Sequence, residues 1–197
     1  RRRHPGGPRP GHGERGRQVV VGGGRRRPED RGDRDDPAAG PVRAVGITNQ
    51  RASTLLWDRA TGVPVAPGLG WQDLRTIGTC LELAAEGIRV APNLSATKAH
   101  HLWDQVDPDR GRDLCVGTVD SWIAWTLSEG ALHVTDPTNA ALTGLRTGDC
   151  TDWSDEVLDR LRLPRHALPT VVDSEGGVGP ATALEGAPVI AGIAGDQ

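Results

Sequence analysis

The pattern of apolar and polar positions divides the chain near residue 41. Before this point aliphatic residues are almost confined to three valines at 19–21, whereas after it short apolar runs recur along the chain. Residues 42–50, VRAVGITNQ, predict a buried strand that ends in polar residues. Residues 187–194 predict a second buried strand, which leads directly into the polar residues at 195–197.

Several segments between these two strands have the spacing of hairpins or helices. Residues 54–65 predict a hairpin whose turn lies at 58–62. Gly87 and Pro164 are typical residues just beyond the C-terminal end of a helix, and Ser95 is a plausible N-cap. Because strands and helices alternate, the sequence indicates an α/β fold. The predicted helices are residues 74–86, 95–106, 116–127 and 154–163.

Residues 1–40 differ in composition from the rest of the chain, because eleven of them are Arg and ten are Gly. Such a segment buries too little apolar surface to offset chain entropy, so we expect a disordered or non-native basic lead-in, such as DNA read in the wrong frame. The alternative is an arginine-rich tail that binds nucleic acid. Six acidic residues and the lack of aromatic side chains in this segment favour the first interpretation.

The charge of the whole chain is nearly balanced, with 23 basic and 26 acidic residues, and indicates neither nucleic acid nor a membrane surface as partner. No apolar run approaches the ~20 residues that span a bilayer. The three cysteines follow no metal-ligand pattern and are typical of reduced thiols in a cytoplasmic protein, so no metal site is predicted. The chain contains no Met, which favours a fragment.

The polar residues after the two buried strands are the candidate chemistry of the chain. Ligand sites of open α/β sheets lie beyond the carboxyl ends of the strands, where residues 48–51 and 195–197 are expected. There Asp196 suits a general base acting on a hydroxyl, or equally the cap of a following helix. Arg51 reads as a site residue or a solvated surface charge, and Trp71 as a site wall or core packing. No glycine-rich phosphate loop of the GxxxxGK[ST] type is present.

Nine short motifs, taken in order, resemble those of the glycerol-kinase-like members of the FGGY carbohydrate kinases. The resemblance covers about four-fifths of the chain and implies the ribonuclease-H-like fold of actin and hexokinase, here as an incomplete first domain spanning residues 41–197. The motifs are GITNQR at 46–51, LWDRATGVP at 56–64, GWQDLRT at 70–76, SATK at 95–98, GTVDSWIAW at 117–125, HVTDPTNA at 133–140, DW at 152–153, LPRHALP at 163–169 and IAGIAGDQ at 190–197.

The resemblance implies ATP-dependent phosphorylation of a polyol, with Mg²⁺ bound to the nucleotide. Asp196 matches the family's catalytic base, and Gln197 matches a neighbouring ligand of substrate hydroxyls. Arg51 matches the arginine that holds hydroxyls, and Trp71 the aromatic wall beside the polyol carbons. These roles agree with the general requirement that a base lie within hydrogen-bond reach of its proton. Family members often form homo-oligomers, but the sequence gives no handle on the surfaces involved.

Two substrate positions depart from the glycerol-kinase pattern. Ala52 stands where these kinases have Glu, and Asn93 where they have Tyr. A site that recognises hydroxyls discriminates steeply, so such changes can alter the substrate. Glycerol, giving glycerol 3-phosphate, is therefore the expected substrate by family, with another polyol or a sugar as the alternative.

Parts of the family pattern are missing from the chain. Residues 1–40 do not reproduce the phosphate hairpin of Asp-x-Gly-Thr type that opens these kinases, and the second domain, with its phosphate loop and adenosine pocket, is absent. We therefore expect this fragment to be inactive and poorly stable, with an uncovered sheet edge, although the full-length parent is a kinase. The alternative is a non-catalytic product of a truncated gene that at most binds a polyol.

Overall fold

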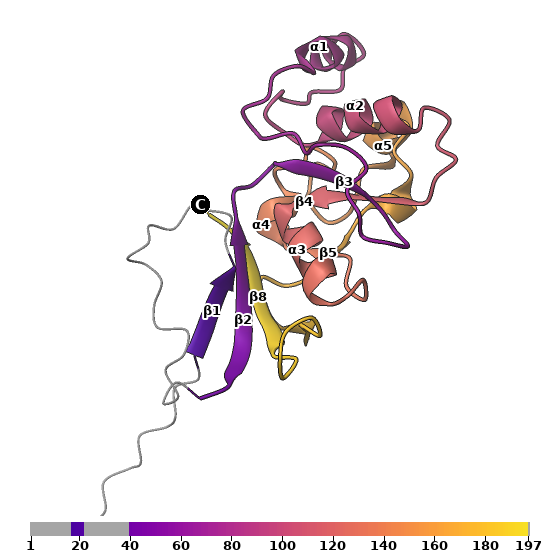
Figure 1. Cartoon of the computed structure of the whole chain (residues 1–197). Helices are drawn as coiled ribbons and strands as arrows, with labels where there is room; N and C mark the ends of the chain where they lie inside the picture. The colour runs from indigo at the N-terminus through magenta and orange to yellow at the C-terminus, as the bar shows by residue number, and fades with distance from the viewer. Residues whose placement is uncertain (1–16, 22–39, 197) are drawn as a thin grey trace, which may run out of the picture.

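The computed structural model describes residues 17–21 and 40–196, which form one four-stranded sheet with a helical part beside it (Figure 1). The sheet has the order β1-β2-β8-β7. Its two inner strands, β2 (Val42–Asn49) and β8 (Val189–Gly195), are parallel, and β7 (Glu175–Pro180) is antiparallel to β8. The alternation of strands and helices confirms the predicted α/β class.

The outer strand β1 (Arg17–Val21) pairs in parallel with β2. Residues 17–21 therefore form a strand where disorder was expected for residues 1–40. Because β1 covers this side of β2, β2 is not the uncovered edge that was expected. The three valines of β1 have high strand propensity, and β2 offers a row of backbone donors and acceptors on this side. Residues 1–16 and 22–39, the remainder of the predicted lead-in apart from Gly40, lie outside the described residues.

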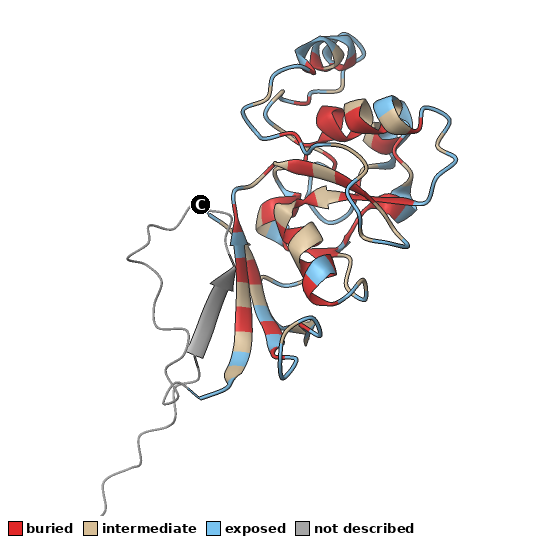
Figure 2. Ribbon diagram, in the orientation of Figure 1, coloured by how far each residue is buried: buried red, intermediate tan, exposed pale blue. Residues whose placement is uncertain are grey.

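The sheet core lies between the sheet and α3 (Val119–Leu127). Val45 and Ile47 of β2 lie two positions apart and share a face, as alternation requires, and they pack with Ile190 and Ile193 of β8. The two isoleucines are three positions apart, and a register shift in the pairing of β2 with β8, after the pair Val45–Ile190, brings both to this face. Ala124 of α3 packs against this face, and the burial pattern of Figure 2 follows the alternation along β2.

A larger helical core lies in the rest of the molecule. It joins β3 (Thr54–Asp58) and β4 (Leu114–Thr118), which pair antiparallel, to α2 (Ala96–Val106) and α5 (Asp155–Arg160). The remaining elements are α1 (Ile77–Ala85), β5 (Val134–Thr135), α4 (Pro137–Ala140), the 3-10 turn η2 (Arg165–Ala167) and β6 (Thr170–Val171).

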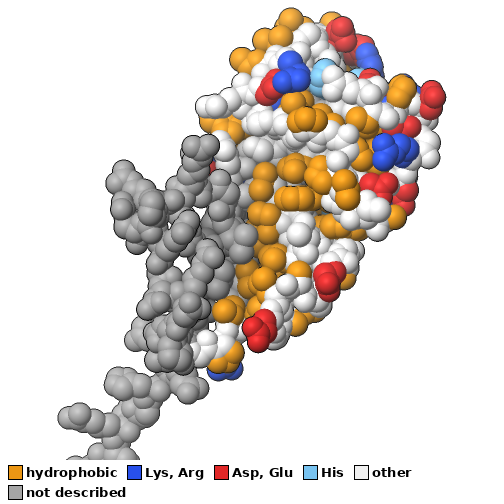
Figure 3. Space-filling view, in the orientation of Figure 1, with side chains coloured by type: hydrophobic (Ala, Val, Ile, Leu, Met, Phe, Trp, Pro, Cys, Tyr) orange, Lys and Arg blue, Asp and Glu red, His pale blue; other side chains and the backbone are white. Residues whose placement is uncertain are grey.

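The predicted elements are present with shifted boundaries. The segment 116–127, predicted as one helix, is half of β4 followed by α3, because residues 116–118 pair with residues 54–56 of β3. The turn of the predicted hairpin is present, with Asp58 N donating to Val63 O at 3.0 Å, but the main partner of β3 is β4. The helix expected over 74–86 begins only at Ile77. On the face shown in Figure 3, apolar side chains gather along the middle of the molecule, beside the sheet.

Candidate functional site

A cleft of about 220 Å³ opens where β2 and β8 end. The two strands are parallel, with Asn49 opposite Gly195, so the chain leaves both at the same edge of the sheet. Ligands of open α/β sheets bind at this edge. The lining residues are Gln50, Arg51, Ala52, Trp71, Asn93, Leu142 and Asp196.

The cleft brings together five of the six site residues named from the sequence. Arg51 and Ala52 follow β2, Asp196 follows β8, Trp71 precedes α1, and Asn93 precedes α2. The sixth, Gln197, lies outside the described residues. Segments that are distant in sequence therefore meet at one hollow.

Arg51 and Asp196 face each other across the ends of the two strands. Arg51 Nε lies 4.0 Å from Asp196 Oδ1, and the side chains are 20% and 49% exposed. This separation exceeds a hydrogen bond, so neither group saturates the other. Arg51 is more buried than a solvated surface charge, which was the alternative interpretation, and neither side chain makes a hydrogen bond to residues 17–21 or 40–196.

Gly195 makes room for Arg51 at the end of β8. A Cβ atom at Gly195 would lie 2.3 Å from Arg51 Cδ and 2.5 Å from Arg51 Cγ, distances that packed atoms do not adopt. The absence of a side chain at residue 195 therefore allows the arginine to cross the strand end next to Asp196.

Ala52 turns the chain from β2 toward β3. Its φ is 59°, in the left-handed region that non-glycine residues rarely occupy, and it is 2% exposed. The Ala52 carbonyl accepts hydrogen bonds from Thr54 Oγ1 at 3.3 Å and Ser95 Oγ at 3.4 Å, which hold this conformation. Its methyl group gives the cleft an apolar position with no hydrogen-bonding group.

Lys98 of α2 holds the backbone of two cleft residues, Trp71 and Asn93, in place. The side chain is fully buried, and its Nζ donates to the carbonyl oxygens of Trp71 at 3.2 Å and Asn93 at 3.0 Å. Burial lowers the pKa of this ammonium group, and the carboxylate of Asp73 opposes the shift. Sequence reasoning missed this role, although the signal was present: Lys98 is the only lysine of the chain.

Three further side chains shape the cleft. Trp71 is 38% exposed, so it forms an open aromatic wall rather than core packing, the other interpretation of this residue. Leu142, just after α4, adds an apolar patch that no sequence motif indicated. Gln50 also lines the cleft, and the sequence indicated it only as one of the polar residues that follow β2.

Across residues 17–21 and 40–196 no group of three His, Cys, Asp or Glu side chains could hold a metal ion. Arg51 is the one cationic side chain among the cleft residues, too few for a triphosphate. In the same part of the chain, no helix is long and apolar enough to cross a membrane.

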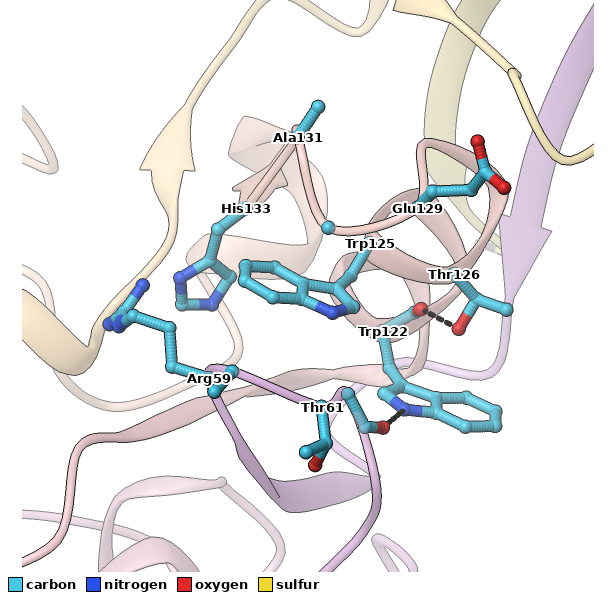
Figure 4. Close-up of a pocket in the computed structure, with 11 residues that line it drawn as sticks. Arg59, Thr61, Trp122, Trp125, Thr126, Glu129, Ala131 and His133 are labelled. Atoms are coloured by element: carbon cyan, nitrogen blue, oxygen red, sulfur yellow. Dashed lines mark hydrogen bonds between the residues drawn. The ribbon is translucent and has the colours of Figure 1, made fainter.

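A second, larger hollow of about 830 Å³ lies between the turn after β3 and the end of α3 (Figure 4). We call it the tryptophan cavity. Trp125 lies edge-on to Trp57 and to His133, with ring centroids 6.1 Å and 5.8 Å apart. Its lining residues are Arg59, Ala60, Thr61, Gly62, Trp122, Trp125, Thr126, Glu129, Gly130, Ala131 and His133.

Two polar side chains of the tryptophan cavity, those of Arg59 and Trp122, bond to the protein itself. Arg59 donates to Asp113 Oδ1 at 2.9 Å and to the His166 carbonyl at 2.7 Å. Trp122 Nε1 donates to the Gly62 carbonyl, as Figure 4 shows. Burial lowers the pKa of His133 to about 4, so its imidazole is neutral near pH 7. Arg59 and Trp122 are therefore engaged within the protein, whereas the Glu129 carboxylate and Trp125 Nε1, which also line the cavity, make no hydrogen bond to a described residue.

Comparison with known proteins places the chain in a family. Residues 38–197 match the model of the N-terminal domain of the FGGY family of carbohydrate kinases. The chain is 45% identical to a glycerol kinase of Aromatoleum aromaticum over 84% of its length, and 44% identical to one of Paracidovorax citrulli over 80%. It spans about a third of these relatives, 36% and 34% of their lengths.

Solved structures agree on the fold. A Plasmodium falciparum glycerol kinase with ADP superposes with a TM-score of 0.71 at 25% identity, over 80% of this chain and 35% of that one. A Rhodospirillum rubrum xylulose kinase gives 0.69 at 18% identity, over 81% of this chain and 36% of that one. The fold is that of the sugar kinases related to actin and hexokinase, as a partial first domain, and the chain belongs to the FGGY family of carbohydrate kinases.

Proposed function

We propose that the whole protein is a cytoplasmic kinase that transfers a phosphoryl group from ATP to a hydroxyl of a small polyol, with glycerol as the first candidate. The observation that carries this proposal is the cleft, in which Arg51, Trp71, Asn93 and Asp196 converge from four segments of the chain. It is supported by the relatives named glycerol kinase, which are 41–45% identical.

The cleft residues have complementary tasks toward a polyol. Arg51 donates charged hydrogen bonds to hydroxyls, while the Trp71 indole packs against the carbon chain. Asp196, half-exposed at the strand end, accepts the proton of the attacking hydroxyl, and Gln197 binds a neighbouring hydroxyl. ATP with Mg²⁺ supplies the phosphoryl group when bound. Because phosphoryl transfer depends mainly on positioning, the fixed cleft walls are the principal contribution of this domain.

A polyol or sugar other than glycerol is the second candidate. Ala52 offers a methyl group where a hydroxyl ligand would need a donor or acceptor, and Asn93, which also lines the cleft, is exposed. Leu142 adds apolar surface. These residues favour a substrate with more carbons than glycerol, and steady-state kinetics of the whole protein with glycerol, erythritol, xylitol and xylulose distinguish the two candidates.

The catalytic assignment is tested by Asp196→Asn in the whole protein, because the amide retains the shape but cannot accept the proton. We expect kcat to fall by about 10²–10⁴-fold with little change in KM. Asp173→Asn, an equal change at an exposed carboxylate outside the cleft residues, is the matched control. An Asp196→Asn variant with the kcat of the unaltered enzyme would remove Asp196 as the base.

We propose that the 197-residue chain alone binds the polyol but does not phosphorylate it, since the cleft offers a triphosphate one cationic side chain, that of Arg51. Saturation-transfer NMR with glycerol or xylitol measures the binding, and a phosphate-transfer assay measures the activity. Phosphorylation by the purified chain would contradict this part of the proposal. Absence of binding to every polyol would favour a non-catalytic product.

A further inference from the structure

The buried carboxylate of Asp136 is connected by hydrogen bonds to the ends of β2 and β8. Asp136 precedes α4, is fully buried, and accepts five hydrogen bonds. Its Oδ1 accepts from the Asn139 amide N at 3.0 Å and Asn139 Nδ2 at 2.8 Å. Its Oδ2 accepts from Thr138 N at 3.0 Å, and from Thr138 Oγ1 and Ser174 Oγ, each at 2.7 Å.

One branch of this network leads to β8. Thr138 Oγ1 donates to Asp136 and accepts from the backbone N–H of Gly195 at 2.8 Å. Gly195 directly precedes Asp196, so the hydroxyl of Thr138 holds the last residue of β8 before the proposed base. The Gly195 N–H can only donate to this hydroxyl, so the single hydroxyl proton is directed to Asp136 Oδ2.

The other branch leads to β2. The side-chain amides of Asn139 and Asn49 bond to each other reciprocally, at 3.0 Å and 3.2 Å. Asn49 is the last residue of β2 and lies two positions before Arg51. A backbone bond from Asp196 N to Asn49 O at 3.1 Å joins the two strand ends directly.

Helix capping explains only part of this arrangement. A cap needs a side-chain oxygen that accepts from the backbone N–H groups of the first turn, which here are those of Thr138 and Asn139. The bonds that continue to Gly195 and Asn49 add nothing to the cap. Burial alone would raise the pKa of Asp136, but the donors of Ser174, Thr138 and Asn139 outweigh it and hold the pKa below its usual value.

We infer that Asp136, Thr138 and Asn139 are positioning residues for the phosphoryl transfer proposed above. They fix the ends of β2 and β8 relative to each other, and so set how Arg51 and Asp196 stand across the cleft. This inference rests on the proposed function. Its structural half, the hold on Gly195, does not depend on activity.

The test compares two substitutions that remove equivalent bonds to Asp136. Thr138→Val and Ser174→Ala each delete a hydroxyl that donates to Asp136 Oδ2 at 2.7 Å, but only Thr138→Val cuts the link to Gly195. Thr138→Ser keeps the hydroxyl and serves as the rescue. All three leave the carboxylate and the backbone cap in place, so folding is retained, and thermal unfolding midpoints check this.

We expect the Gly195 amide of the 197-residue chain to exchange about tenfold faster in Thr138→Val than in Ser174→Ala or Thr138→Ser, because only the valine leaves that amide without its acceptor. In the whole protein, kcat should fall about tenfold in Thr138→Val alone, with a smaller change in KM. Equal kcat values in Thr138→Val and Ser174→Ala would overturn the inference, as would equal exchange at Gly195. If the unaltered whole protein phosphorylates no polyol, the proposed function fails. The inference is then decided by the exchange rate of the Gly195 amide and by the polyol affinity of the 197-residue chain, each compared between Thr138→Val and Ser174→Ala.

Discussion

The cleft and the tryptophan cavity contain similar residues, but their arginines differ in how far they bond within the protein. Both have an arginine and exposed indole surface, and the cavity is nearly four times larger, at about 830 Å³ against about 220 Å³. In the cavity, Arg59 bonds to Asp113 and to the His166 carbonyl. In the cleft, Arg51 and Asp196 stand 4.0 Å apart, too far to satisfy each other.

We propose that hydrogen-bonding capacity, rather than volume, distinguishes a binding site from a cavity that binds nothing. Polar groups that already bond within the protein gain little from a ligand, because a new bond replaces an existing one. Groups held close without bonding can gain from a ligand hydroxyl that bridges them. The four predictions below test this distinction, beginning with the largest expected effect.

The two arginines provide the most direct test. Arg51→Ala should weaken polyol binding by about 10–100-fold, since it removes charged hydrogen bonds to hydroxyls. Arg59→Ala should leave polyol affinity unchanged and lower the free energy of unfolding by about 1 kcal/mol, because its bonds are internal. NMR titration and chemical denaturation of the 197-residue chain measure both. Equal effects of the two substitutions on affinity would remove the distinction.

Two glycines test the same contrast through packing. Gly195→Ala should displace Arg51, whose Cδ would lie 2.3 Å from the new Cβ, and reduce polyol affinity about tenfold. Gly62→Ala, with φ +69° and a Cβ 2.9 Å from Trp125 Nε1, should destabilise the fold by about 2 kcal/mol without changing affinity. Unfolding and binding curves of both variants are the measurement, and a Gly195→Ala variant that binds normally speaks against the cleft.

Acid pH should change the free energy of unfolding through His133, which lines the tryptophan cavity. The pKa of His133 falls from 6.5 to about 4 on folding, so the unfolded chain binds more protons between these pH values, and folding loses up to about 3 kcal/mol as the pH falls. Burial raises the pKa of Asp120 from 3.8 to about 6, which has the opposite sign: stability rises by up to about 3 kcal/mol as the pH falls from 6 to 4.

The two shifts largely cancel, and single substitutions should separate them. His133→Gln should become more stable on acidification from pH 6 to 4, whereas Asp120→Asn should become less stable over the same window. Urea unfolding at several pH values measures the slopes. The same slope in both variants would show that neither group titrates as its burial indicates.

The smallest effect is expected at Gly78, near the start of α1. A Cβ at Gly78 would meet no atom within 4 Å, and alanine favours helix over glycine by about 1 kcal/mol. Gly78→Ala should therefore raise the free energy of unfolding by about 0.5–1 kcal/mol and leave polyol binding unchanged. It is also the control for the other glycine substitutions, and a loss of binding there would implicate α1 in the cleft.

Much of the fold could be predicted because its signals are local. The run VRAVGITNQ gave β2 within a residue, and the apolar run near the C-terminus gave β8 with its polar end. The start of α3 was wrong by three residues, because Val116 and Thr118 fit a strand as well as a helix until their pairing with β3 is known. The strand β7, with three glycines in six residues, has no apolar periodicity to reveal it.

The motif residues that line the cleft could be predicted from the sequence, but the hydrogen bonds that hold its walls in place could not. Arg51 and Asp196 lie at strand ends, where sequence reasoning looks first. The bonds of Lys98 to two carbonyl oxygens and of Thr138 to the Gly195 amide have backbone partners, and the sequence does not indicate which backbone groups a side chain will reach, even where the side chain itself is as conspicuous as the single lysine. Leu142 enters the cleft only through the path of the chain after α4.

The bonds of Lys98 have a consequence for how such a pocket can diversify. Lys98 holds the walls at Trp71 and Asn93 through their carbonyl oxygens, so the position of each wall is independent of the side chain it presents. At the proposed site, we expect substitution at residue 93 to alter what the cleft recognises without moving the backbone of its walls. A lineage can therefore explore new substrates one residue at a time, while a lysine beneath the pocket preserves its shape.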